Sequence, residues 1–204
     1  GDLDLYTLRS QGPASSLYMN EVGRFVDVEA GVGGTVSATG GAWADFDSDG
    51  DVDLLVSTAG RTALYENQRD GTFADVGSAS LPAAALAAGL TGGVATADYD
   101  ADGDIDAFIG HLEAADLLLR NDASASGRWL QVELVGRPGQ TVLGSRVRVH
   151  SDDSVQLREY VVSTQIGTAS GHELHFGLGD NEQVELDIHW ASGQQQTLPS
   201  IAAN

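Results

Sequence analysis

Two nine-residue segments of the sequence each carry five aspartates at alternate positions. The first, Asp-Phe-Asp-Ser-Asp-Gly-Asp-Val-Asp, covers residues 45–53, and the second, Asp-Tyr-Asp-Ala-Asp-Gly-Asp-Ile-Asp, covers residues 98–106. Two unit charges held 4 Å apart repel by about 4 kcal/mol at an effective dielectric constant near 20. A tight turn at Gly50 or Gly103 therefore keeps these carboxylates together only when a cation lies between them. Several oxygen ligands in a tolerant geometry favour calcium over magnesium, zinc or a redox metal.

The spacing assigns a role to each aspartate of the two loops. Positions one, three, five and nine supply side-chain oxygens, and position seven offers its backbone carbonyl. The predicted ligands in the first loop are Asp45, Asp47, Asp49 and Asp53, with Asp51 giving its carbonyl. Those in the second loop are Asp98, Asp100, Asp102 and Asp106, with Asp104 giving its carbonyl. We therefore expect about two calcium ions.

The start of the sequence carries a fragment of the same motif. Gly-Asp-Leu-Asp-Leu at residues 1–5 matches Gly-Asp-Val-Asp-Leu at residues 50–54, without the leading half of the loop. Asp2 and Asp4 alone cannot make a site. A third calcium ion is expected only if this truncated loop is completed.

An EF-hand shares part of this spacing but does not fit the sequence. It needs a bidentate Glu at loop position 12 and a helix on either side. Position 12 is Val56 in one loop and Ile109 in the other, and the residues that follow each loop have the apolar pattern of a strand. The EF-hand interpretation is therefore rejected.

The loops belong to a repeat of about 50 residues. Leu-Tyr-Met-Asn at 17–20 matches Leu-Tyr-Glu-Asn at 64–67, and Leu-Leu-Arg-Asn at 118–121 is a third, degenerate copy. Thr-Gly-Gly precedes both complete loops. Short apolar runs separated by Asp-Gly and other turns predict about four strands per unit, which is the size of a propeller blade. Residues 81–90 are Ala-rich and predict a short helical turn.

The pattern of residue types along the sequence changes after Asn121. A small polar linker precedes alternating runs at 129–135, 145–150, 157–163, 172–178 and 183–190, which predict a compact antiparallel domain of five or six strands. The predicted fold is all-β: partial propeller blades with calcium-binding loops at 1–122, then a C-terminal antiparallel β domain at 128–204.

Composition excludes several classes of partner. The chain has 204 residues and a formal net charge of −20, with 30 acidic residues, ten Arg and no Lys, so nucleic acid is not expected to bind. No window approaches 18 consecutive apolar residues, so no membrane insertion is expected. Without Cys, disulfides and thiolate sites are absent.

The His, Trp, Arg and Ser residues give weaker indications of function than the aspartates. The five His form no recognisable ligand set, and His175 is expected to be structural. Trp43, Trp129 and Trp190 are expected to pack in the core or between blades. Arg146, Arg148 and Arg158 could form a small basic strip on the C-terminal domain. The default expectation is that they are solvated side chains on its surface. No Gly-x-Ser-x-Gly elbow is present.

Gly-x-Phe-x-Asp-Val occurs at residues 23–28 and again at 71–76. The two loops, with these segments and the Leu-Tyr-x-Asn segments, resemble FG-GAP/VCBS repeats, the calcium-binding blades of integrin-alpha-like β-propellers. The C-terminal part resembles the ASPIC/UnbV domain that follows such repeats in cartilage acidic protein 1 and its bacterial relatives. The segments that carry this second resemblance are 129–136, 143–147, 174–179 and 190–193. A closed propeller of this type needs about seven blades. Either further blades precede this chain or another copy completes the first blade.

The resemblance implies a secreted calcium-binding protein, at the cell surface or outside the cell, with a structural or adhesive role and no enzymatic activity. Its expected partners are calcium and a protein or glycan of the cell surface or matrix. Two alternatives stay open. The chain could be a self-assembling homo-oligomer or fibre subunit of an extracellular array, or an accessory module of a larger secreted enzyme.

Overall fold

The fold class agrees with the sequence prediction. The computed structural model describes residues 3–9, 15–28, 30–32, 38–87, 91–122, 127–152, 154–161 and 173–204. These residues form an all-β protein of antiparallel sheets with two four-residue helices, and none of the sheets they build closes into a barrel.

Three sheets follow one another along the first part of the chain. Sheet 1 has the order β1-β2-β3, sheet 2 the order β4-β5-β6-β7, and sheet 3 the order β10-β9-β8. The strands of sheets 1 and 2 are β1 (Leu5–Thr7), β2 (Ser16–Glu21), β3 (Arg24–Val28), β4 (Ala38–Ala44), β5 (Asp53–Thr58), β6 (Thr62–Asn67) and β7 (Phe73–Asp75). Those of sheet 3 are β8 (Thr91–Ala97), β9 (Asp106–His111) and β10 (Leu117–Leu119). Sheet 2 has the four strands predicted for a blade, and sheets 1 and 3 have three each among the described residues.

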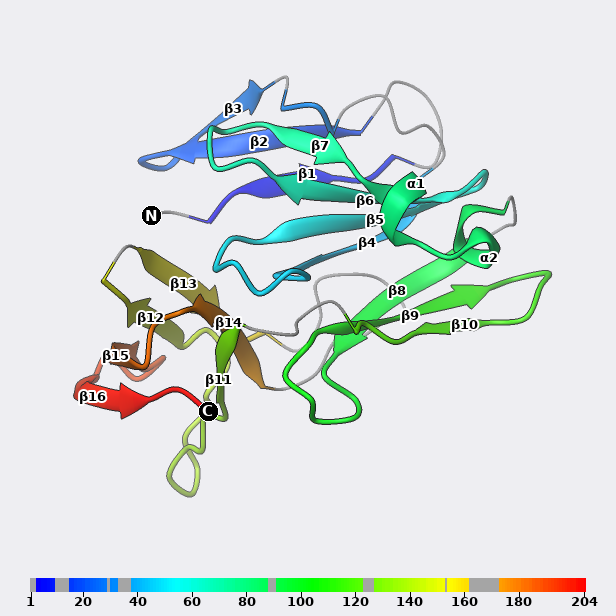
Figure 1. The fold of residues 1–204 in the computed structure, drawn as a ribbon. Helices are drawn as coiled ribbons and strands as arrows, with labels where there is room; N and C mark the ends of the chain where they lie inside the picture. The colour runs from blue at the N-terminus through cyan, green and yellow to red at the C-terminus, as the bar shows by residue number, and fades with distance from the viewer. Residues whose placement is uncertain are drawn as a thin grey trace.

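Sheet 2 lies between the other two sheets, with an apolar layer on each face (Figure 1). Successive residues of β5 point to opposite layers, so Leu54 and Val56 pack toward sheet 1 while Leu55 packs toward sheet 3. All six residues of β5 are buried. Trp43 contacts the rings of Tyr6 and Phe73 in the first layer, as expected for a packing residue.

The repeated Thr-Gly-Gly segments bring β4 and β8 together. The Thr39 and Thr91 hydroxyls hydrogen-bond at 2.6 Å. A Cβ added at Gly40 would lie 3.1 Å from the Cα of Gly93, so the two backbones approach closely because neither carries a side chain. The repeat therefore encodes the contact between sheets 2 and 3.

Two helices lie between β7 and β8. They are α1 (Gly77–Ser80) and α2 (Ala83–Leu86). Helix α2 confirms the helical turn predicted within 81–90, although residues 88–90 lie outside the described part of the chain.

The C-terminal part has six described strands, in agreement with the predicted five or six. Two of them, β11 (Arg128–Val132) and β14 (Leu174–Gly179), form a two-stranded sheet. A second sheet has the order β13-β12-β15-β16, with β12 (Arg146–His150), β13 (Val155–Glu159), β15 (Gln183–His189) and β16 (Gln195–Ala202). Sequence runs indicated every strand except β16. The two sheets enclose a core that includes Phe176 and Val147.

The basic strip suggested by the sequence does not form. Arg158 of β13 pairs in register with buried Val147 of β12, whereas Arg146 and Arg148 alternate to the opposite face. Arg158 therefore faces inward, and the other two Arg face outward.

Figure 1 shows the C-terminal strands gathered at the end of the blades from which the acidic loops project. Hydrogen bonds join the two parts at this end, from Gly177 to Asp45 and from His175 to Gly103. No helix within the described ranges has the length and apolar character needed to cross a membrane.

Candidate metal centres

Each acidic loop joins two neighbouring strands and gathers three carboxylates. The first loop connects β4 to β5, and the second connects β8 to β9. Asp45, Asp47 and Asp53 offer oxygens within 4.8 Å of one another. Asp98, Asp100 and Asp106 do the same in the second loop. The carboxylates at motif positions one, three and nine thus converge in both copies.

The two loops share one backbone conformation. Gly50 and Gly103 both have a φ of 98°, and the residues two positions earlier, Ser48 and Ala101, have φ of 59° and 60°. Left-handed conformations at these points curl the chain so that alternate side chains face the same centre. The turn predicted at each glycine is present in both loops.

Backbone amides hold the first carboxylate of each loop in place. Asp45 Oδ1 accepts from the Asp49 N–H at 3.0 Å, and Oδ2 accepts from the Gly50 N–H at 3.0 Å. Asp98 accepts equivalent bonds from the Asp102 and Gly103 amides at 3.2 and 3.1 Å. These bonds orient the carboxylate and take up part of its charge.

An asparagine that the sequence analysis did not assign to the site closes each loop. The Asn67 N–H donates to Asp53 Oδ1 at 2.9 Å, and its side-chain amide donates to the Val52 carbonyl at 3.3 Å. Asn121 makes the same pair of bonds, to Asp106 Oδ1 at 2.8 Å and to the Ile105 carbonyl at 3.3 Å. The available signal was the repeated Leu-x-x-Asn, which marked the strand but not its contact.

The truncated loop at the start of the chain carries the same closure. The Asn20 N–H donates to Asp4 Oδ1 at 2.8 Å, and its side-chain amide donates to the Leu3 carbonyl at 3.1 Å. Asp4 is therefore the structural counterpart of Asp53 and Asp106. Asp2 lies outside the described residues.

The side chains of the other two aspartates of each loop lie outside the groups of three, and the backbone carbonyl ligands at Asp51 and Asp104 stay a prediction. Asp49 and Asp51 of the first loop both pair with Arg69. In the second loop, the Asp102 carboxylate accepts from the Asp104 N–H at 3.0 Å, and Asp104 is buried. The structure thus separates three carboxylates that converge from two that do not in each loop.

Burial makes the ion-free carboxylates of the first loop weak acids. Burial raises the pKa of Asp45 to about 7, against the lowering effects of Arg158 and the Gly50 amide. Burial likewise raises the pKa of Asp53 to about 7, although the Asn67 and Phe46 amides lower it. The pKa of Asp47 is raised by burial and then by the Asp49 charge. A bound cation would favour the ionised forms that burial disfavours.

The donor set suits a hard divalent cation. All three convergent ligands in each loop are carboxylates, which calcium and magnesium prefer over softer donors. The residues that would hold the ions are Asp45, Asp47 and Asp53 in one loop and Asp98, Asp100 and Asp106 in the other. A bound ion would supply the positive charge that such convergence requires.

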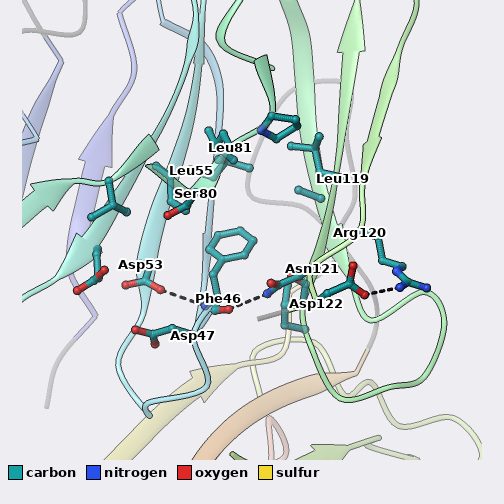
Figure 2. Close-up of a pocket in the computed structure, with 16 residues that line it drawn as sticks. Phe46, Asp47, Asp53, Leu55, Ser80, Leu81, Leu119, Arg120, Asn121 and Asp122 are labelled. Carbon is teal, nitrogen blue, oxygen red and sulfur yellow. Dashed lines mark hydrogen bonds and ion pairs between the residues drawn. The ribbon is translucent and has the colours of Figure 1, made fainter. Parts of the chain in front are cut away.

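A cavity of about 470 Å³ lies between sheets 2 and 3 beside the first loop (Figure 2). Asp47 and Asp53 line one end, and apolar side chains that include Leu81 and Leu119 line the other. The Asn121 side chain crosses from sheet 3 and donates to the Phe46 carbonyl at 2.7 Å. The cavity gives the two carboxylates an open side, and Asn121 ties the first loop to the third blade.

A further group of metal-ligating side chains, which the sequence analysis did not indicate, lies on the C-terminal sheet. His150, Glu185 and Asp187 offer ligand atoms within 4.8 Å of one another. His150 Nε2 lies 3.1 Å from Asp187 Oδ2, and the Thr197 hydroxyl donates to Asp187 Oδ1 at 2.6 Å. Cross-strand pairing accounts for this group, so we assign no metal to it.

Two known families match the chain in the order that the sequence resemblance predicts. The FG-GAP-like repeat family matches residues 45–109, which include both acidic loops. The family described as ASPIC and UnbV matches residues 136–204. A comparison with curated proteins gives no match. FG-GAP repeats are typical of extracellular or surface proteins, and they commonly bind calcium. The chain therefore contains an FG-GAP-like repeat followed by an ASPIC/UnbV domain.

Proposed function

We propose that this chain is a non-enzymatic calcium-binding module of the cell surface or extracellular matrix, in which two calcium ions make the blade loops rigid. Its role is structural or adhesive, and its partner is a protein or a glycan. The observation that carries the proposal is the recurrence of one three-carboxylate group with one hydrogen-bond frame in two successive repeats.

Calcium binding and folding are linked in such a loop. The unliganded carboxylates repel one another, so the ion binds the folded loop and stabilises it against unfolding. At free calcium a hundredfold above Kd, each ion contributes about 2.7 kcal/mol to the free energy of unfolding. Two saturated sites therefore contribute about 5 kcal/mol, a large share of the roughly 5–15 kcal/mol that stabilises an ordinary domain.

A thermal melt with calcium and with chelator tests the proposal, together with a calorimetric titration of the ion-free chain. We expect a higher midpoint with calcium and a stoichiometry near two. The variant Asp47→Asn/Asp100→Asn is the matched control, because it removes one convergent carboxylate from each loop and keeps the backbone hydrogen bonds to Asp45, Asp53, Asp98 and Asp106. The same melting midpoint for the wild-type chain with calcium and with chelator would contradict the proposal.

Self-assembly is a second candidate, favoured by apolar side chains on both outer sheets. Val22, in the turn between β2 and β3, is 95% exposed, and Phe25 of β3 is 50% exposed. Phe108 and Leu118 of sheet 3 are 43% and 55% exposed. These sheets lie at opposite ends of the stack of blades (Figure 1). A contact between the two ends of successive copies would be head-to-tail and would propagate as a fibre.

The oligomeric state of the calcium-loaded chain decides this candidate. We expect concentration-dependent growth in sedimentation or light scattering, abolished by Phe25→Asp at one end or Leu118→Asp at the other. A calcium-loaded monomer at all concentrations tested would reject self-assembly and leave the calcium proposal standing.

A further inference from the structure

We propose that the C-terminal domain is a structural part of both cation sites, holding each acidic loop through its own set of contacts. Gln156 acts as a positioning residue for the first loop and His175 for the second. This inference rests on the proposed calcium binding and adds that the two loops depend on different residues of one domain.

The first loop is held through the Asp45 carboxylate. The Gly177 N–H donates to Asp45 Oδ2 at 3.1 Å, so one oxygen of a predicted ligand accepts from both its own loop and β14. A Cβ at Gly177 would overlap that oxygen, which explains the glycine. The Gln156 side-chain amide donates to the Gly177 carbonyl at 2.6 Å and supports this strand from β13.

Gln156 also faces the turn of the first loop. Its Nε2 lies 3.2 Å from the position that a Cβ at Gly50 would occupy. Its Oε1 accepts from Arg158 at 3.3 Å, so the donor and acceptor ends of the Gln156 amide are both engaged. Replacing Gln156 therefore disturbs the strand that binds Asp45 and the surface on which Gly50 packs.

Arg158 places a positive charge behind the same loop. Its guanidinium lies 5.3 Å from the centroid of the Phe176 ring, on the inward face of β13. Within the described ranges no carboxylate lies at ion-pair distance from Arg158. The acids that act on it are Asp45 and Asp51, and in turn its charge lowers the pKa of Asp45 against the effect of burial. The C-terminal domain therefore offsets part of the negative charge of the first loop.

The second loop is held by a different pair of side chains. His175 Nε2 donates to the Gly103 carbonyl at 2.8 Å, since a carbonyl can only accept. The Trp129 ring stacks on the His175 imidazole, with centroids 6.0 Å apart and planes at 24°. A Cβ at Gly103 would overlap the Trp129 indole. Trp129 is thus a packing residue as expected, but between the second loop and the C-terminal domain.

These contacts act on the conformation that binds the ion. The two docked glycines, Gly50 and Gly103, form the left-handed turns that bring the carboxylates together. Docking therefore orders the loop before the ion arrives, and a bound ion orders the surface on which the domain docks. Linkage requires each process to strengthen the other by the same factor.

A calcium titration followed by NMR reads the two sites separately. The Gly50 and Gly103 amides each donate to the first aspartate of their own loop, so their resonances report one site each. We expect His175→Leu to weaken binding at the second loop about tenfold, as loss of an outer-shell partner typically does, and to leave the first loop nearly unchanged. Gln156→Leu should weaken binding at the first loop about tenfold and leave the second loop nearly unchanged. His175→Gln restores a side-chain N–H donor and should recover part of the affinity at the second loop.

The pattern of effects separates positioning from general destabilisation. If His175 and Gln156 had a merely structural role, each variant would weaken calcium binding at both loops together. That result overturns the inference, and so does unchanged calcium binding at both loops. If the wild-type chain binds no calcium, the proposed function itself fails. If it binds two ions and the variants respond loop by loop, both proposals stand.

A distance measurement covers the case in which the variants do not fold. The chain has no Cys, so Gln68→Cys and Gln194→Cys would place one label on an exposed residue of each part. We expect a narrow inter-label distance distribution with calcium and a broader one with chelator. An identical distribution in a wild-type background that binds calcium also overturns the inference.

Discussion

A single asparagine per repeat links the cation loop to the strand that pairs with the one leaving the loop. Its backbone amide orients the last aspartate, and its side chain binds the carbonyl just before that aspartate. At Asn121 the side chain also reaches the Phe46 carbonyl of the neighbouring loop. One residue therefore stabilises its own site and the contact between blades.

Asn121→Ala removes both side-chain bonds and leaves two carbonyls without that donor. We expect a loss of about 1–3 kcal/mol in the free energy of unfolding by denaturant, and weaker calcium binding at both loops. Asn20→Ala is the matched control, because Asn20 makes the equivalent bonds at the exposed truncated loop. Equal losses for the two variants would contradict the role given to the contact between blades.

The raised pKa values of Asp45 and Asp53 predict how stability depends on pH without calcium. These carboxyls titrate near 7 when folded and near 3.8 in an unfolded chain, so the folded state holds its protons more tightly. The ion-free chain should therefore lose stability as the pH rises from about 4 to about 7. Saturating calcium takes the place of the protons and should flatten or reverse this slope. Melting midpoints measured across that range, with chelator and with calcium, check the prediction; parallel curves contradict it.

Among the elements, the contact between β4 and β8 depends on residues without side chains. Gly40→Ala would place a methyl group 3.1 Å from the Gly93 Cα and from the Val94 nitrogen, both backbone atoms that cannot rotate away. We expect a loss of about 1–3 kcal/mol in the free energy of unfolding. Gly60→Ala, whose Cβ would lie 3.9 Å from the Thr58 hydroxyl, should change stability little. Equal effects in chemical denaturation would count against the close approach.

Repetition made the blades and loops predictable from the sequence. An Asp-rich loop followed by an apolar strand occurs in register twice, and each local feature depends on residues close in the chain. Docking between the two parts joins residues far apart, such as Asp45 and Gly177. No local pattern encodes such a pair. The inward turn of Arg158 was missed for a related reason, because it depends on the register between β12 and β13 rather than on the type of residue.

On the scale of the whole molecule, the net charge of −20 divides into two parts. The two complete loops concentrate ten of the aspartates, and two calcium ions would offset four of these ten negative charges. Arg69 pairs with Asp49 and Asp51 of the first loop, and Arg120 pairs with Asp100 of the second. The acids outside the loops remain to be screened by solvent and salt.

Salt should therefore stabilise the chain most when calcium is absent. Raising sodium chloride from 0.01 M to 0.15 M shortens the screening length from about 30 Å to about 8 Å and weakens the repulsion among loop carboxylates. We expect the melting midpoint of the chelated chain to rise over this range, and that of the calcium-loaded chain to rise less. Equal shifts would show that the repulsion lies outside the loops.

The burial of β5 on both faces has a consequence for the motions of the protein. A strand enclosed by a sheet on each side can exchange its amide protons with solvent only after a neighbouring sheet has moved away. Deuterium should therefore enter residues 54–57 last, at a rate set by opening of the whole stack. The outer sheets, each covered on one side, should open earlier and offer the first sites to a protease.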